Sequence, residues 1–429
     1  MSEYLSEIVR SQKNGERRGI ASICSAHPWV LKTALQGSEP VLIEATCNQV
    51  NQFGGYTGMT AAGFRAFVHE LAKANDFPVD HLILGGDHLG PSPWQHLPAE
   101  SAMGNAAELV RSFVQAGFTK IHLDTSMHLG GDDPAIPLNR ELAARRTASL
   151  AKIAEDCPEA KPNRLRYVIG TEVPIPGGAQ AGEAGLQVTT VEQARSTIEA
   201  IRAAFEAAGL QSAWERVIAL VVQPGVEFGS DYVVDYDPAA AADLARFAET
   251  IPLIYEAHST DYQRPENLRS LVRDHFAILK VGPGLTFAFR EAVFALAEME
   301  AELFQPEQCS QIIEVMDEAM LKEPDKWQDY YRGNEMEVAL ARKFSLSDRI
   351  RYYWAKPAAQ KSLARLLENF GEKPLPVSLV SQYMHQLYSP IREGKIRNSA
   401  DSILSEAIRG VLREYEHACR ENKLVDCQS

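Results

Sequence analysis

The sequence lacks the motifs that most often bind nucleotides or structural metals. Its 429 residues contain no GxxxxGK[ST] loop, and no GxGxxG follows the first predicted strand. These absences argue against a P-loop kinase and against a dinucleotide-binding fold. The six cysteines form no CxxC pair and no Cys/His metal spacing, so we interpret them as free thiols in a reducing compartment.

Positive charge and long apolar runs are also scarce. The 43 Lys and Arg residues against 57 Asp and Glu residues give a net charge of −14, which argues against nucleic-acid partners and anionic membrane surfaces. No stretch approaches the roughly 18 apolar residues that a membrane helix needs, and no signal peptide is visible. We therefore expect a cytoplasmic protein, in which any phosphate on a substrate needs a locally prepared site.

What the sequence does contain is an alternation of short apolar runs with helical segments. Eight runs have the length and composition of buried strands: 20–27, 41–46, 82–91, 120–124, 167–172, 216–224, 252–258 and 276–282. A helical segment follows each of them: 28–35, 60–74, 102–116, 138–154, 191–208, 238–249, 264–274 and 287–303. Eight such units in about 280 residues predict a closed (β/α)8 barrel rather than an open doubly wound sheet.

After residue 304 the alternation stops. The remaining sequence has helical patterns over 308–320, 337–354 and 402–423, and proline residues interrupt the stretch between the last two. We therefore predict a (β/α)8 barrel with a short N-terminal helix over 1–304 and a helical extension packed on the barrel over 305–429.

Chemically active side chains stand at the ends of the predicted strands, where barrel enzymes carry their active sites. A purely structural rim would not need such a set: Ser25, His27, Glu44, Asp87, His88, Asp124, Glu172, Gln223, Glu256, His258, Asp261 and Lys280.

These strand ends suit metal-assisted carbonyl chemistry. His88, Glu172 and His258 come from three strands and could converge on one divalent ion acting as a Lewis acid. Candidate bases are the acids Asp87, Asp124, Glu256 and Asp261. The alternative for each histidine is a buried, hydrogen-bonded ring, which we expect most for His122. Glu44 and Lys280 could instead neutralise one another inside the barrel.

The residues that would bind a substrate phosphate are harder to identify from the sequence. Barrels commonly bind phosphate with the loops after strands seven and eight, using hydroxyls and backbone N–H groups at a helix start. Two arginines of the extension could fold over the same place, although ordinary capping and surface charge are the alternative. The candidates are Ser259, Thr260, Gly282, Gly284, Arg290, Arg349 and Arg351.

Several longer motifs point to one family. They span 25–28, 42–46, 48–59, 85–91, 169–174, 221–228, 255–262 and 346–354. On these motifs the chain resembles the D-tagatose-1,6-bisphosphate aldolase non-catalytic (Z-type) subunit family over nearly its whole length, and the motif at 48–59 is the most specific.

The resemblance implies a barrel of the class II aldolase type and a place in tagatose or galactitol catabolism. Some members of the family support a separate zinc aldolase, others are D-tagatose-6-phosphate 4-epimerases, and some are called tagatose-6-phosphate kinases. The Asp87-His88 pair is similar to the pair in catalytic class II aldolases, where the aspartate is the base and the histidine binds the metal.

We therefore predict a metal-dependent epimerase acting at C4 of ketohexose 6-phosphates, with zinc as the expected divalent ion. The alternative is a non-catalytic subunit that stabilises a tagatose-bisphosphate aldolase, and a homo-oligomer is expected in either case. The acids at the barrel mouth favour the enzyme. Substrate contacts are expected from Glu44, Asn48, Gln49, Gln223, Ser259, Asp261 and Lys280.

Overall fold

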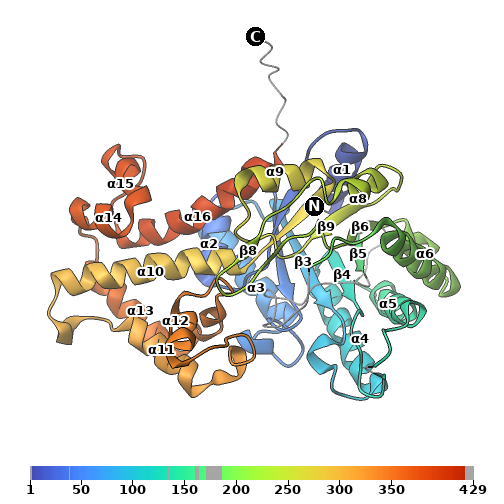
Figure 1. The fold of residues 1–429 in the computed structure, drawn as a ribbon, viewed down its shortest axis with the longest axis horizontal. Helices are drawn as coiled ribbons and strands as arrows, with labels where there is room; N and C mark the ends of the chain where they lie inside the picture. The colour runs from blue at the N-terminus through green and yellow to red at the C-terminus, as the bar shows by residue number, and fades with distance from the viewer. Residues whose placement is uncertain (1, 38, 134, 160–163, 171–185, 421–429) are drawn as a thin grey trace, which may run out of the picture.

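The centre of the molecule is a closed barrel of parallel strands, shown in Figure 1. The computed structural model describes residues 2–37, 39–133, 135–159, 164–170 and 186–420. The first strand pairs with both the second and the last, which closes the ring and confirms the predicted (β/α)8 barrel. In chain order the strands are β1 (Ile20–Ile23), β2 (Val41–Thr46), β3 (Leu82–Leu89), β4 (Lys120–Asp124), β5 (Arg166–Gly170), β6 (Val217–Val221), β9 (Ile254–Ala257) and β10 (Phe276–Val281).

Helices surround the barrel, one after each strand. Local signals set several of their starts: Pro28 opens the first of them, and Thr60 caps the next by accepting a hydrogen bond from the Gly63 N–H, as such residues do at helix starts. These helices are α2 (Pro28–Ala34), α3 (Ala61–Ala74), α4 (Ala99–Gln115), α5 (Arg140–Glu155), α6 (Val191–Ala207), α8 (Ala242–Ala248), α9 (Pro265–Arg273) and α10 (Pro283–Leu303), with a short α7 (Gln211–Trp214) before β6.

One end of the barrel is closed by apolar packing. Leu5 and Ile8 of α1 (Ser2–Lys13) are buried against an inward-facing set from the strands. This apolar plug closes the barrel at the end where the strands begin, although β4 and β5 themselves start with the buried polar residues Lys120 and Arg166. The strand residues in the set are Ile20, Leu42, Ile83, Val168, Ile218, Ala219, Val221, Ile254, Ala277 and Ile278.

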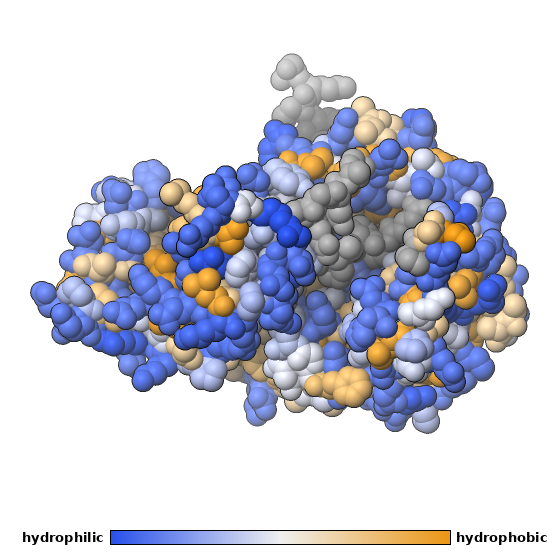
Figure 2. Space-filling view, turned by 60° about the horizontal axis from the view of Figure 1, so that its bottom comes forward, coloured by the Kyte–Doolittle hydropathy of each residue, from blue (hydrophilic) through white to orange (hydrophobic). Residues whose placement is uncertain are grey.

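The extension is built around the long helix α10, which runs out of the barrel (Figure 1). Figure 2 shows the extension and the barrel as two masses with a hollow between them, and hydrophilic side chains dominate both on this face. The division of the chain at residues 304 and 305 stays a proposal. The further helices are α11 (Ile312–Lys322), α12 (Glu335–Phe344), α13 (Pro357–Phe370), α14 (Val377–Tyr383), α15 (His385–Arg392) and α16 (Ala400–Cys419).

Two local predictions differ from the structure. The expected continuous helix over 337–354 is wrong: α12 ends at Phe344, and a short 3-10 helix, η6 (Arg349–Tyr353), follows a left-handed Asp348 (φ 47°). The loop after β6 also contains an unpredicted antiparallel pair, β7 (Glu227–Phe228) with β8 (Val233–Val234). Both differences bring side chains to the polar end of the barrel.

Within the described ranges, the structure contains no helix that combines the length and the apolar character needed to cross a membrane.

Candidate active site

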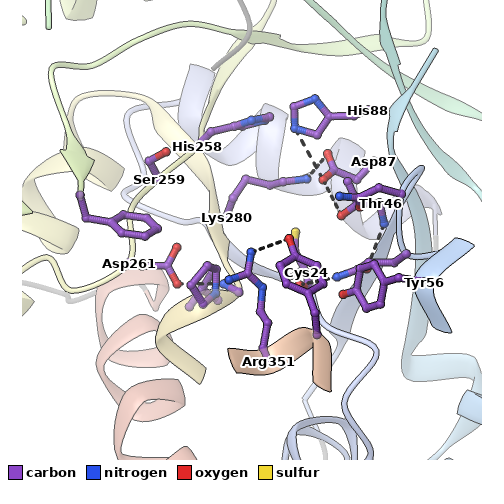
Figure 3. A pocket seen from close by; sticks show the side chains of 17 residues that line it. Cys24, Thr46, Tyr56, Asp87, His88, His258, Ser259, Asp261, Lys280 and Arg351 are labelled. Carbon is purple, nitrogen blue, oxygen red and sulfur yellow. Dashed lines mark hydrogen bonds and ion pairs between the residues drawn. The ribbon is translucent and has the colours of Figure 1, made fainter. Parts of the chain in front are cut away.

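A pocket opens at the C-terminal end of the barrel strands (Figure 3). Its floor carries Asp87, His88, His258 and Lys280, and its wall includes Arg351 from η6 of the extension. The pocket therefore combines strand-end residues of the barrel with a segment that lies about 70 residues after the last strand.

Two adjacent residues of β3 both face into the barrel. In a regular strand Asp87 and His88 would point to opposite faces. Here the pairing of β3 with β4 shifts register between Gly86 and Leu89, and His88 is left-handed (φ 48°). This bulge turns both side chains toward the centre, which is a known use of bulges beside active sites.

Three histidines and Asp87 surround one point. The ring centres of His88 and His122 are 4.9 Å apart, those of His88 and His258 are also 4.9 Å apart, and those of His122 and His258 are 5.4 Å apart. One potential ligand atom from each of the four residues lies within 4.8 Å of the others, and all four residues are buried. This group could hold a metal ion.

Each ring has one nitrogen fixed by a carboxylate. Nδ1 of His88 lies 2.8 Å from Asp124, Nδ1 of His122 lies 3.0 Å from Asp87, and Nε2 of His258 lies 3.0 Å from Glu256. Metal-binding histidines are typically oriented in this way, because a carboxylate on one nitrogen leaves the other as a lone-pair donor.

The free nitrogen of His122 supports this interpretation. Its Nε2 is buried and has no hydrogen-bond partner among the described residues. The two neighbours of Nδ1 favour different tautomers, because the backbone N–H of His88 donates to it, at 3.1 Å, whereas Asp87 would accept a proton from it. The tautomer with the proton on Nδ1 leaves Nε2 free for a metal, whereas a proton on Nε2 would lack an acceptor in the described part of the chain.

A layer of ion pairs lies beneath the histidines. Lys120 Nζ is 2.5 Å from Glu44 and 2.6 Å from Glu256, and Lys280 Nζ is 3.0 Å from Glu44. Lys280 also pairs with Asp87. Gly85 makes room for this layer, because a Cβ there would approach the Glu44 Cγ to 2.8 Å.

The buried carboxylates of the site outnumber its ammonium groups. Four carboxylates (Asp87, Asp124, Glu44 and Glu256) face two ammonium groups (Lys120 and Lys280). Buried charges are costly unless they are compensated. With neutral rings, two negative charges remain, and a divalent ion would neutralise them. Burial opposes charge on His88, but Asp87 and Asp124 raise the pKa of this ring, so a proton on His88 is the alternative source of one positive charge.

The neighbouring charges also set the proton affinities. Burial opposes charge on Asp87, but Lys280 and His88 hold the pKa of that carboxyl well below its usual range. Burial likewise opposes charge on Lys280, yet Asp87 raises the pKa of its amine well above the ordinary value. Burial lowers the pKa of His258 to about 3, so this ring is a neutral potential ligand.

The structure brings some of the predicted metal and catalytic residues together. His88 and His258 lie in one group, whereas Glu172 falls outside the described residues. Of the predicted bases, Asp87 lines the pocket, while Asp124 and Glu256 lie behind the histidines and do not.

The predicted substrate contacts also divide into two sets. Glu44 lies in the ion-pair layer and forms an ion pair with Lys280. This is the alternative to substrate binding that the sequence offered for these two residues. Gln223 turns away, and its side-chain oxygen accepts hydrogen bonds from the N–H groups of Gly225 and Val226. The residues that do line the pocket are Asn48, Gln49, Ser259, Asp261 and Lys280.

Several of the predicted phosphate-binding groups already donate hydrogen bonds within the protein. The N–H groups of Gly282 and Gly284 both donate to Asp261, at 2.9 and 2.7 Å, so the α10 N-terminus is already capped by a carboxylate. The Thr260 hydroxyl donates to the Lys280 carbonyl, at 2.6 Å.

Of the three predicted arginines, Arg351 lines the pocket and the other two lie apart from the metal group. Arg290 lies over the Phe287 ring, 4.0 Å from Asp348 and outside the pocket lining. Arg349 lines a neighbouring recess, where it stacks on Tyr330 with its Cζ 3.5 Å from the ring centre.

Sequence reasoning missed His122 and Lys120. The expectation that His122 is merely a structural ring does not match its place in the four-residue group. Lys120, His122 and Asp124 are two residues apart along β4, so the alternation of a strand puts all three on the interior face. That pattern could have identified both missed residues.

Comparisons with known proteins cover most of the chain. The family model described as D-tagatose-1,6-bisphosphate aldolase subunit GatZ/KbaZ-like matches residues 5–420. A crystal structure of a probable tagatose 6 phosphate kinase from Sinorhizobium meliloti 1021 is 45% identical, with a TM-score of 0.86, and the match covers 94% of this chain and 100% of that one.

Two other solved structures are much more distant. The fructuronate-tagaturonate epimerase UxaE from Cohnella laeviribosi is 13% identical with a TM-score of 0.47, over 94% of this chain and 81% of that one. The YdjI aldolase from Escherichia coli K12 is 11% identical with a TM-score of 0.42, over 86% of this chain and 96% of that one.

Proposed function

The chain belongs to the D-tagatose-1,6-bisphosphate aldolase subunit GatZ/KbaZ-like family, and from this membership we propose that it is a metal-dependent 4-epimerase of ketohexose 6-phosphates. The proposed reaction converts D-tagatose 6-phosphate to D-fructose 6-phosphate. The observation that carries the proposal is the buried group of Asp87 and three histidines at the floor of a pocket.

The residues for a metal are His88, His122 and His258, with Asp87 beside them. We propose zinc, because imidazole nitrogens suit it. When bound, such an ion would polarise the substrate carbonyl as a Lewis acid. The chain's own contribution is to fix each imidazole through Asp124, Asp87 or Glu256.

Asp87 is the best-placed general base. It lines the pocket, and Lys280 and the neighbouring imidazoles keep it ionised, so it can accept a proton. All three carboxylates hold a histidine, but Asp124 and Glu256 do not line the pocket. We therefore place the proton transfer on Asp87 and keep the other two as positioning residues.

The proposed reaction is a retro-aldol cleavage followed by aldol addition. C4 is not adjacent to the C2 carbonyl, so removal of an α-proton cannot invert it. Asp87 takes the C4 hydroxyl proton, the C3–C4 bond breaks, and its electrons form a three-carbon enediolate. The charged Lys280 amine can donate a hydrogen bond to the oxygen that gains negative charge. The aldehyde then turns, C3 attacks its other face, and Asp87 returns the proton to O4.

The test is turnover by the purified chain alone. We expect NMR to detect D-fructose 6-phosphate forming from D-tagatose 6-phosphate, and we expect excess EDTA to abolish the reaction. Zinc added back after removal of the chelator should restore it. Full activity in EDTA would exclude the metal mechanism, and absence of turnover with every divalent ion tried would exclude the epimerase.

A second candidate function is that of a stabilising partner of a catalytic aldolase. An exposed apolar stripe on α12 supports it: Met336 is 80% exposed, Leu340 59% and Phe344 46%. These residues recur every four positions, so they share one helix face. Exposed apolar stripes of this kind are often binding surfaces.

This alternative makes a different prediction for purification. A tagatose-bisphosphate aldolase co-expressed with this chain should co-elute with it and lose thermal stability without it. Met336→Lys combined with Leu340→Lys should separate the two proteins, while the matched exposed change Glu335→Lys on the same helix should not. Independent elution of the two wild-type proteins would remove this function.

A further inference from the structure

A second cavity adjoins the active-site pocket. Its wall comes from the loops after β1 and β2, the start of α10 and the segment after η6. It is continuous with the first pocket, because the two share Cys24, Gln49, Tyr56, Gly282, Arg351 and Tyr352. A ligand at the metal group could therefore extend into this side cavity.

The side cavity carries one positive charge, and the acids that interact with it, Asp261 and Asp348, lie outside the cavity lining. Arg351 lines it, and no Asp or Glu is among its described lining residues. His27 also lines it and is neutral, because burial lowers the pKa of this ring to about 3. In a chain with a net charge of −14, such a place is where a dianionic group would be least repelled.

The wall also contains polar groups that lack partners. Trp354 Nε1 and His27 Nδ1 are both buried without a hydrogen bond to any described residue. An unpaired buried indole N–H is costly. The wall of the side cavity thus holds two polar groups without partners among the described residues, in addition to the Arg351 cation.

The other candidate anion sites are less suitable. The amides at the start of α10 already donate to Asp261. In the recess beside Arg349, the two cations Arg349 and Lys326 are balanced by two acids, Asp325 and Asp329. Both features make these places less favourable for a phosphate group.

We propose that the side cavity binds the phosphate group of the sugar phosphate, with Arg351 as its charge partner. The reacting carbons then lie at the metal group in the adjoining pocket. The identity of the sugar rests on the proposed epimerase function, whereas the location of the phosphate rests on the cavity itself.

The experiment measures binding rather than turnover. Isothermal titration calorimetry with D-tagatose 6-phosphate, D-tagatose and inorganic phosphate separates the phosphate contribution from that of the sugar. Arg351→Gln should weaken binding of the two phosphates about 10- to 100-fold. Arg351 also donates to the Ser347 and Asp348 carbonyls, so this variant could fail to fold.

Two substitutions of opposite charge at Gln360 test the same proposal without changing Arg351. Gln360 is exposed and lines the side cavity, and its side-chain amide donates to the Trp354 carbonyl, at 2.6 Å. Gln360→Lys should tighten binding of D-tagatose 6-phosphate and inorganic phosphate, and Gln360→Glu should weaken it, each about 2- to 5-fold. Binding of D-tagatose should not change. Asp329→Asn, in the Arg349 recess, is the matched control and should leave all three affinities unchanged.

The outcomes distinguish this inference from the proposed function. If the Gln360 pair leaves phosphate binding unchanged, or if Asp329→Asn tightens it, the phosphate does not lie in the side cavity. If the expected pattern appears but the chain does not epimerise D-tagatose 6-phosphate, the phosphate site stands and the epimerase proposal falls.

Discussion

At the scale of single residues, Asp87 has two tasks that mutation can separate. Its Oδ1 faces Lys280 and His122, and its Oδ2 accepts a hydrogen bond from Thr46, at 3.3 Å. Asp87→Asn keeps the shape but loses the proton acceptor. We expect turnover to fall about 10²- to 10⁴-fold, and metal affinity about 10- to 100-fold because His122 loses its carboxylate.

Asp124→Asn is the matched control for this prediction. Asp124 also orients a histidine, His88, but does not line the pocket. Both variants should bind metal more weakly, as measured by competition with a metal-binding dye. At saturating metal Asp124→Asn should recover turnover and Asp87→Asn should not, and recovery by Asp87→Asn would move the base elsewhere.

The metal ligands can be tested one by one. His122→Gln removes a ring whose Nε2 has no partner among the described residues, so we expect it to abolish stoichiometric zinc binding measured by mass spectrometry of metals. Glu172→Gln tests the ligand predicted from sequence in the same assay. If His122→Gln keeps its full zinc content and Glu172→Gln loses zinc, the three-histidine site is wrong. The ligands are then the set predicted from the sequence, which contains Glu172 in place of His122.

At the scale of elements, the strands were predictable and the geometry of their ends was not. The apolar runs around β2, β4 and β10 match their predicted bounds to within a residue, because buried parallel strands carry continuous apolar sequence. No such pattern indicates the bulge in β3, since it arises from the pairing with β4. His122 was nevertheless within reach, because strict alternation along β4 places it beside Asp124.

The extension was the least predictable part. A helical pattern over 337–354 is interrupted in the structure because Asp348 adopts a left-handed conformation and its side chain accepts a hydrogen bond from Thr286 of α10, at 2.5 Å. This is a tertiary contact between segments 62 residues apart, which local sequence does not report. Arg351 reaches the pocket only because the helix breaks there.

The Asp348 contact gives a prediction for pH. Burial raises the pKa of this carboxyl from 3.8 to about 7, against the opposing effect of Arg290. The folded state therefore holds the proton more tightly than the unfolded state, and stability from this group is full below about pH 4 and is lost as pH rises to about 7. Asp348→Asn should be more stable than the wild type at pH 8, by on the order of a few kcal/mol, and equally stable near pH 4.

Urea unfolding at several pH values measures this difference. Asp329→Asn, an exposed change in the same extension, is the control and should leave the pH profile unaltered. A constant difference between Asp348→Asn and the wild type across this pH range would show that proton binding by Asp348 does not couple to folding.

At the scale of the whole molecule, the buried charges link metal binding to stability. The ion-pair layer carries more carboxylates than ammonium groups, and it lies at the centre of the barrel rather than at an exposed rim. A ligand that binds only the folded state stabilises it by about 2.7 kcal/mol at 100 times its dissociation constant. We expect chelation to lower the melting temperature by several degrees and zinc to restore it.

His122→Gln supplies the control for the melting experiment. If the ion binds at the histidines, the melting temperature of this variant should no longer respond to chelator or zinc. An equal response in the variant and the wild type would place the stabilising ion at another site, and no response in either would remove the link between metal and stability.

The position of α16 has a consequence for how the chain folds during synthesis. This helix, the last that the structure describes, packs on β1, α2 and α9. Its Cys419 carbonyl accepts a hydrogen bond from the Gly19 N–H, at 2.9 Å, and its Tyr415 hydroxyl donates to the Thr260 carbonyl, at 2.7 Å. The ribosome therefore synthesises β1 about 380 residues before α16, the helix that covers it. Synthesis proceeds at about 5–20 residues per second. For tens of seconds the nascent barrel must keep that apolar face covered by other means, so a nascent chain stalled before residue 400 should bind chaperones, and release of α16 should end that binding.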